Sequence, residues 1–109
     1  MTQYEIRWAN LPAPIGRRPV LLLTRASAYA YLHKVIVAEV TTTIRDIPVE
    51  VAISAREGLS RPSVVNFDNI HVVPTALLGE RIGQLSPQRR REVKRAVGYA
   101  LNWPELKVL

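Results

Sequence analysis

The sequence contains no cysteine, which excludes a disulfide scaffold, a thiolate metal site and a cysteine nucleophile. Its two histidines, His33 and His71, do not have the spacing of paired metal ligands, so we expect no metal centre. No apolar run approaches the ~18 residues of a membrane span, and the first residues lack a signal-peptide pattern. We therefore expect a cytoplasmic protein that makes no contact with a membrane.

The chain also lacks the short motifs of common cofactor-dependent enzymes. It has neither a glycine-rich phosphate-binding loop nor the nucleophile elbow of a serine hydrolase. We expect no cofactor. Cofactor-free cleavage of RNA remains open, because the 2′-hydroxyl of the substrate is then the nucleophile and the protein only positions groups, moves protons and stabilises charge.

Lysine is scarce: only three of the 15 basic residues are lysines, and the other 12 are arginines. With nine acidic residues the formal net charge is +6, which favours an anionic partner. Arginine offers a planar, bidentate fork that suits phosphate or carboxylate better than the point charge of lysine does. A bias in genomic base composition would produce the same excess of arginine.

Apolar sequence is present only in short runs, within a chain of 109 residues that is 48% hydrophobic. We expect residues 1–109 to form one globular domain, because the chain is too short for two cores. The most apolar run, residues 19–23, has the length of a strand buried on both faces, with Pro19 as its first residue. Arg17 and Arg18 then lie at the mouth of this strand, where they bind a phosphate or are ordinary solvated charges.

The other strands are predicted from alternating or short apolar runs. They cover residues 4–11, 34–41, 49–54, 63–67, 70–73 and 83–85. Asp68 and Asn69 are expected to form a turn between two of these strands. Residues 26–32 form a loop or a short helix.

A C-terminal helix is predicted from Ser86 as N-cap, with Pro87 at the first helical position, to Leu101. Residues 89–91 are three arginines that oppose the dipole of this helix, so they contact an anion or form a solvated face. Its apolar stripe comprises Val93, Ala96, Val97, Ala100 and Leu101. Many short strands followed by one helix favour a mainly β fold: a small, partly closed antiparallel barrel with the helix packed on it.

Four segments together resemble the MazF/PemK toxins and follow that family's order: residues 16–23, 37–51, 63–70 and 83–87. The resemblance runs from about Tyr4 to Leu101. It implies an SH3-like barrel that forms a homodimer and cleaves single-stranded RNA at specific sequences without a metal, as the toxin of a type II toxin–antitoxin system. It also implies a cognate antitoxin that occludes the RNA groove. Because the net charge is +6, we expect that antitoxin to be acidic and partly disordered.

The resemblance also implies roles for single residues. Arg18 matches the family's arginine before the proline of this strand and would stabilise the scissile phosphate or donate a proton there. Thr41 matches its threonine at the end of the third strand and would hydrogen-bond the phosphate oxygens. The guanidinium of Arg18 stays protonated, so it is suited to stabilising a phosphate and is a poor base. We further expect RNA contacts from Arg17, Arg25, Thr42, Thr43 and Arg45.

The sequence leaves the general base open. The first loop, residues 12–17, lacks the glutamate or histidine that many relatives carry there. Asp68 matches a base used in part of the family, or caps a turn. His71 stands where relatives often have an arginine; it is either an acid–base group or a structural side chain. Glu39 is a base or merely neutralises Arg18.

Two further functions stay open. The same fold family includes CcdB-like inhibitors of DNA gyrase, which bind a protein and cleave nothing. Such an inhibitor would not need Arg18 and Thr41 together. The missing acid in the first loop also leaves room for a catalytically degenerate relative. Three aromatic residues could stack on splayed bases, namely Trp8, Tyr29 and Tyr31, although Trp8 also suits the core.

Overall fold

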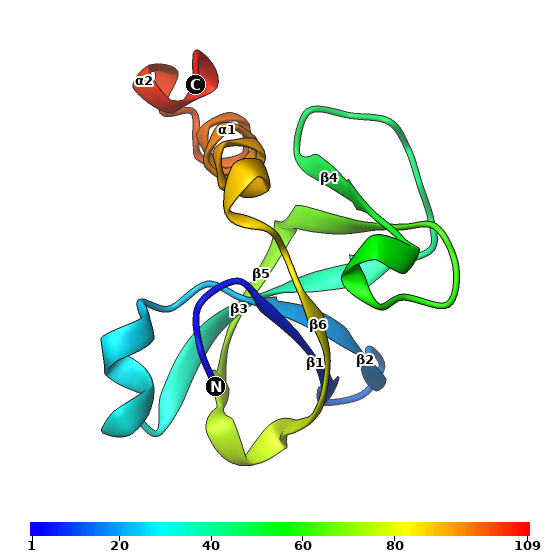
Figure 1. Ribbon diagram of the computed structural model, residues 1–109, viewed down its shortest axis with the longest axis vertical. Helices are drawn as coiled ribbons and strands as arrows, with labels where there is room; N and C mark the ends of the chain where they lie inside the picture. The colour runs from blue at the N-terminus through cyan, green and yellow to red at the C-terminus, as the bar shows by residue number, and fades with distance from the viewer.

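The computed structural model describes residues 1–109 as a curled six-stranded antiparallel sheet with helices at one end (Figure 1). The strands are β1 (Glu5–Asn10), β2 (Arg17–Leu22), β3 (Lys34–Thr41), β4 (Glu50–Ile53), β5 (Ser63–Pro74) and β6 (Leu78–Gln84). Their order in the sheet is β4-β5-β3-β2-β1-β6. The 3₁₀ turns are η1 (Ala26–Ala30), η2 (Ala55–Glu57), η3 (Thr75–Leu77) and η4 (Pro87–Arg89), and the helices are α1 (Arg90–Leu101) and α2 (Pro104–Lys107). Neither helix has the length and apolar sequence needed to cross a bilayer.

β2 is the expected buried strand, and it lies between β1 and β3. Its last three residues, 20–22, are fully buried, although the strand begins two residues earlier than predicted. Pro19 is opposite Trp8 of β1, whereas pairing with β3 begins one residue later. Alternate residues of a strand direct their backbone groups to the same side, and Leu23 donates to Ile36 of β3. The N–H that Pro19 lacks would therefore face β3 one residue past the last paired residue of this ladder, Val20, and the end of a strand is where proline is tolerated.

The predicted turn at residues 68–69 is wrong. β5 is one continuous strand that pairs antiparallel with β3 over its length. The pairing moves from Asn66 opposite Glu39 to Ile70 opposite Ala38, so the three residues between them form a bulge. An Asp-Asn pair suits a turn and an irregular bulge equally well. Only the partner strand decides between them, and here both halves of β5 pair with the same strand.

β6 is longer than the strand predicted at residues 83–85, and it closes the barrel. Its first residues include a glycine and two charged side chains, so their composition gives little strand signal. A Cβ on Gly83 would lie 2.0 Å from the carbonyl oxygen of Glu57, and one on Gly58 would lie 2.3 Å from that of Ile82. These glycines let the backbone of β6 meet the turn after β4.

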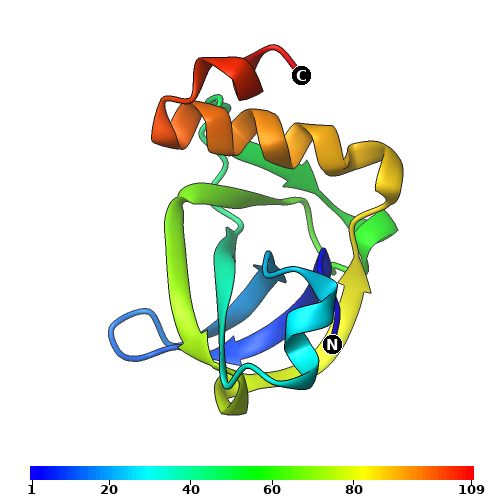
Figure 2. The same cartoon turned by 90° about the vertical axis from the view of Figure 1, so that its left-hand side faces the viewer.

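α1 lies across one end of the barrel (Figure 2). The mainly β barrel with a C-terminal helix is thus confirmed. The chain enters α1 through the 3₁₀ turn η4, and Ser86 makes no side-chain cap hydrogen bond. Asn102 ends α1 in the left-handed conformation, and the unpredicted α2 packs back against Gly98. Four of the predicted stripe residues meet the core (Val93, Ala96, Val97 and Ala100), whereas Leu101 is 48% exposed.

Arg89 fixes the start of α1 and is neither the solvated charge nor the anion contact expected. Its side chain is only 14% exposed and pairs with Glu92 at 2.8 Å and Glu57 at 3.5 Å. It also donates to the carbonyl oxygen of Ala52. The hydrogen bond from Arg89 lowers the pKa of Glu92 and outweighs the opposing effect of burial. Arg90 and Arg91 are both exposed and form no ion pair, and the Arg90 guanidinium lies over the Tyr4 ring.

Candidate active site

Arg18, Glu39 and His71 form a charged cluster across β2, β3 and β5. The carboxylate of Glu39, whose side chain is 8% exposed, accepts from Arg18 Nη1 at 3.1 Å through one oxygen. Its other oxygen is hydrogen-bonded to Nε2 of His71. The side chains of Arg18 and His71 are 32% and 30% exposed. Glu39 therefore holds a guanidinium and an imidazole together while both still reach solvent.

The bulge of β5 selects His71 rather than Asp68 for this cluster. An uninterrupted register would place Asp68 opposite Val37 of β3, but the bulge places His71 there. Residues two apart on a strand share a face, so His71 lies beside Glu39. Asp68 is exposed; its carboxylate makes no hydrogen bond, and its backbone N–H donates to Oδ1 of Asn66 at 2.9 Å. The side chain that caps this irregular segment is thus that of Asn66.

Arg18 and Thr41 lie at the same level of neighbouring strands. The register between β2 and β3, continued two residues past its last pair, brings them opposite each other. The Thr41 hydroxyl oxygen accepts the N–H of Thr43 at 3.1 Å, which leaves its own proton free to donate. Arg18 Nε is buried without a partner, and Nη2 lies 3.4 Å from the carbonyl oxygen of Ile15. Both side chains thus keep donors that an anion could use.

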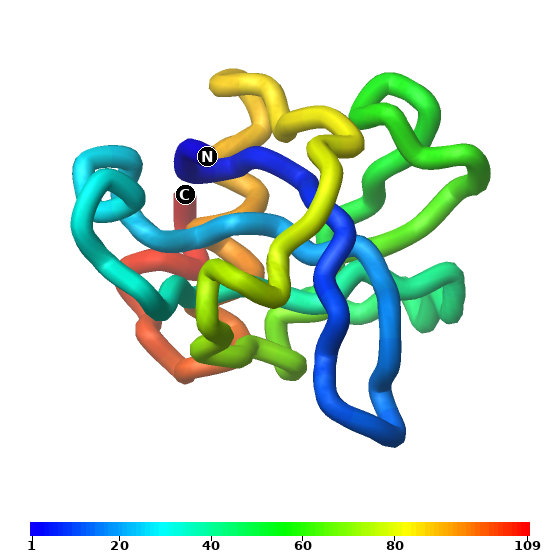
Figure 3. Tube along the Cα trace, turned by 90° about the horizontal axis from the view of Figure 1, so that it is seen from below, coloured from blue at the N-terminus to red at the C-terminus, as the bar shows by residue number.

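Arg17 and Arg18 point to opposite faces of β2, because side chains alternate along a strand. The guanidinium carbon of Arg17 lies 4.1 Å from the ring centroid of Trp8, and Arg17 has no carboxylate partner. Both arginines lie at the start of β2, as predicted, but their side chains belong to opposite faces of the strand. Seen from below, the β1–β2 turn that precedes them projects from the body, away from both termini (Figure 3).

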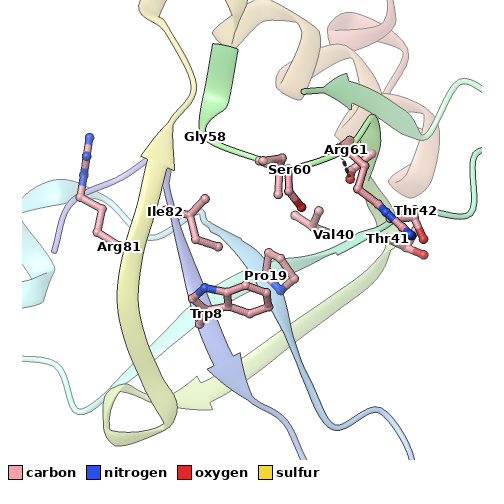
Figure 4. Close-up of a pocket in the computed structure, with 12 residues that line it drawn as sticks. Trp8, Pro19, Val40, Thr41, Thr42, Gly58, Ser60, Arg61, Arg81 and Ile82 are labelled. Atoms are coloured by element: carbon pink, nitrogen blue, oxygen red, sulfur yellow. Dashed lines mark hydrogen bonds between the residues drawn. The ribbon is translucent and has the colours of Figure 1, made fainter. Parts of the chain in front are cut away.

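A cleft of about 470 Å³ lies on the Trp8 side, between the β1–β2 hairpin and the connection from β4 to β5 (Figure 4). Trp8 and Pro19 lie on one side of it, and Ser60 and Arg61 come from the connection opposite. Thr41, at the end of β3, also lines it. Sequence reasoning missed Ser60 and Arg61, because nothing in an expected loop shows which strand it will face.

The remaining candidates are divided between two regions. Thr42, Thr43 and Arg45 are exposed in the loop after β3, where the carboxylate of Glu50 accepts the backbone N–H of Arg45 at 3.0 Å. Arg25 follows the far end of β2, about 20 Å along the strand from Arg18 by the usual rise per residue. Arg25 is therefore remote from the cluster.

The two tyrosine candidates lie in that remote region as well. Tyr31 is exposed and accepts a 2.6 Å hydrogen bond from Arg25. Tyr29 packs against the apolar cluster around β2 and β3, and burial raises its pKa to about 12. Trp8 is thus the aromatic candidate that lines the cleft. No group of three or more histidine, aspartate or glutamate side chains is arranged to hold a metal ion.

The family model of the PemK-like, MazF-like toxins of type II toxin–antitoxin systems matches residues 2–101. The chain belongs to this family. The toxin is 42% identical over 88 residues to the endoribonuclease MazF3 of Mycobacterium tuberculosis. The aligned region covers 79% of this chain and 85% of the relative. The resemblance to MazF/PemK toxins is therefore confirmed.

Two solved structures share the fold of the toxin. Mycobacterium tuberculosis toxin MazF-mt6 matches with a TM-score of 0.85 and 39% identity, covering 90% of this chain and 96% of the other. An endoribonuclease in complex with its cognate antitoxin, from a mycobacterial species, matches with a TM-score of 0.81 and 25% identity, covering 95% and 97%. The similarity thus includes β6 and α1 and not only the four segments noticed in the sequence.

Proposed function

We propose that this toxin is a metal-independent, sequence-specific endoribonuclease that cleaves single-stranded RNA in the cytoplasm, with residues 1–109 as one functional domain. The cluster of Arg18, Glu39 and His71 is the observation that carries this proposal. It combines a fixed cation for a phosphate with an imidazole for proton transfer, both reachable from solvent. The endoribonuclease named among its relatives supports the same activity.

We assign the general base to His71. Its Nε2 faces the Glu39 carboxylate, which favours a proton on that nitrogen and leaves the lone pair on Nδ1. Nδ1 removes the proton of the 2′-hydroxyl, whose oxygen attacks the adjacent phosphorus. The P–O bond to the 5′ oxygen then breaks, giving a 2′,3′-cyclic phosphate and a 5′-hydroxyl end. Arg18 stays protonated, so the leaving oxygen takes its proton from water.

Arg18 and Thr41 are assigned to the reacting phosphate. Charge on its oxygens grows as the fifth bond to phosphorus forms, and fixed donors stabilise that state more than the ground state. Glu39 positions both Arg18 and His71 and does not itself take the proton. We assign contacts with the RNA backbone of flanking nucleotides to four exposed residues. Arg17 lies on one side, and Thr42, Thr43 and Arg45 lie on the other. Arg25 and Asp68 have no role in the chemical step.

The decisive assay is cleavage of a long single-stranded RNA in EDTA, with a DNA copy of the same sequence as control. We expect cuts at one short sequence, cyclic phosphate ends and intact DNA, because DNA lacks the 2′-hydroxyl. Cutting that stops in EDTA would contradict the mechanism. Inhibition of DNA gyrase without any RNA cleavage would instead identify a CcdB-like inhibitor, and the absence of both activities a degenerate relative.

We further propose that the toxin forms a homodimer through the outer part of β3 and β5. Ile36, Ile70 and Val72 are 43%, 36% and 65% exposed there. Ile36 is opposite Val72, and Ile70 lies two residues before Val72 on β5, so the three share one face. Such an apolar strip on so small a protein favours a second copy as its cover.

Val72→Glu is expected to split this dimer, because it places a charge in the centre of the apolar strip. Sedimentation at micromolar concentration should give about twice the 12.3 kDa chain mass for the wild type and a single chain for the variant. Val108→Glu is the matched control, since Val108 is 84% exposed at the C-terminus. A wild type that sediments as a stable monomer would refute the proposed dimer.

The cognate antitoxin is proposed to be an acidic, partly disordered protein that covers the basic groove. Support comes from the net charge of +6 and from the mycobacterial relative solved with its own antitoxin. Arg17 and Arg61 have no carboxylate partner in the toxin, so they are available to an acidic segment. Such association is fast and weakens as salt is added.

A further inference from the structure

The cleft beside Trp8 has the shape and chemistry of a binding site for a flat aromatic ring. Its volume of about 470 Å³ falls within the range of small-ligand pockets. Trp8 and Pro19 offer it flat apolar surfaces, and Val40 and Ile82 add aliphatic walls. The Arg17 guanidinium covers the indole at 4.1 Å, which holds Trp8 in place and adds positive charge nearby.

The opposite wall supplies groups that can hydrogen-bond the edge of such a ring. The Ser60 hydroxyl and the Arg61 guanidinium have no side-chain partner in the protein, and Figure 4 shows both coming from the connection that faces Pro19. Arg81 also lines the cleft, but its side chain points away in Figure 4, and its Nε donates to Glu5 at 3.0 Å. Ser60 and Arg61 are thus the free polar groups opposite the stacking surface.

The cleft adjoins the site assigned to the reacting phosphate. Thr41, which is assigned to the phosphate, lines the cleft and lies at the level of Arg18 on the neighbouring strand. Arg18 itself points to the other face of β2 and does not line the cleft. A ligand with a flat ring one sugar away from a phosphate would place the ring in the cleft and the phosphate at Thr41, which is the geometry of a nucleotide.

We propose that this cleft holds one nucleobase of the RNA, stacked on Trp8, and that Ser60 and Arg61 recognise its edge. This inference rests on the proposed RNA cleavage and assigns part of the sequence specificity to two residues. A nucleobase is favoured over a side chain of a protein partner for two reasons. The cleft is bordered by two unpaired guanidinium groups, Arg17 and Arg61, and it leads to the phosphate site. Stacking gives affinity to any base, and the donors opposite select among bases.

Mapping of cut sites tests the assignment of Ser60 and Arg61. In Ser60→Ala and Arg61→Gln we expect the preference at one position of the recognised sequence to fall about tenfold, with the other positions unchanged. Arg56→Gln is the matched control, because Arg56 is 76% exposed on the same connection and does not line the cleft. Unchanged preference at every position in both variants would overturn the proposal, whereas a wild type that cuts no RNA would overturn the proposed function instead.

Fluorescence tests the cleft independently of cleavage. The chain has two tryptophans, so Trp103→Phe leaves Trp8 as the only reporter. Four single-stranded homopolymers of 2′-O-methyl RNA, which cannot be cut, serve as probes. We expect one of them to quench Trp8 at several-fold lower concentration than the others, and an abasic strand of equal length to leave it unchanged. Equal quenching by the abasic strand, or quenching by an acidic peptide alone, would show that the cleft does not hold a base.

Discussion

Arg18→Ala is expected to slow RNA cleavage about 10²- to 10³-fold, because the variant loses a fixed charge donor at the reacting phosphate. Arg18→Lys should recover little of this loss. An ammonium group is a point charge and cannot reproduce the planar fork that reaches Glu39 and a phosphate together. The measurement is the initial rate of cleavage of one RNA at its mapped site, in EDTA. Near wild-type cleavage by either variant would refute the role of Arg18.

The same substitution has a cost in stability that the sequence alone does not predict. As a solvated residue at a strand end, Arg18 would contribute little to the free energy of unfolding. In the structure it is the guanidinium partner of a buried carboxylate, and its removal leaves Glu39 with His71 alone. We expect a loss of about 1–3 kcal/mol. Adding Glu39→Gln to Arg18→Ala should restore part of the stability and none of the cleavage, which separates the two effects.

The central strands could be predicted from sequence because their signals are local. β3 has the predicted bounds, and the apolar run of β2 is buried as expected, since each is a short aliphatic segment with few polar interruptions. The alignment of Arg18 with Thr41 depends on a short register between these two adjacent strands. That part of the site was therefore accessible from motifs alone.

The rest of the site depends on contacts between distant segments. His71 meets Glu39 only because a bulge in β5 changes its pairing with β3, and the local Asp-Asn sequence does not reveal that change. Ser60 and Arg61 face Trp8 only because the barrel closes, with the backbones of Gly83 and Glu57 in close approach. Strand partners and barrel closure are properties of the whole chain, so no window of sequence contains them.

His71→Gln is expected to slow cleavage about 10²- to 10⁴-fold, the range typical for loss of a general base. The glutamine amide can still donate to the buried Glu39 carboxylate, so the melting temperature should change little. The control is Asp68→Asn at the neighbouring bulge, where the carboxylate is exposed and makes no hydrogen bond. This control should cleave at nearly the wild-type rate. Slow cleavage by Asp68→Asn, with full activity in His71→Gln, would transfer the role of base to Asp68.

The pH dependence of kcat/KM separates a base from a residue that only shapes the site. A general base works in its unprotonated form, so wild-type cleavage should rise with pH. The residual activity of His71→Gln should lack this rise, because glutamine does not titrate. A profile of His71→Gln parallel to that of the wild type would show that another group accepts the proton, even if the variant were slow.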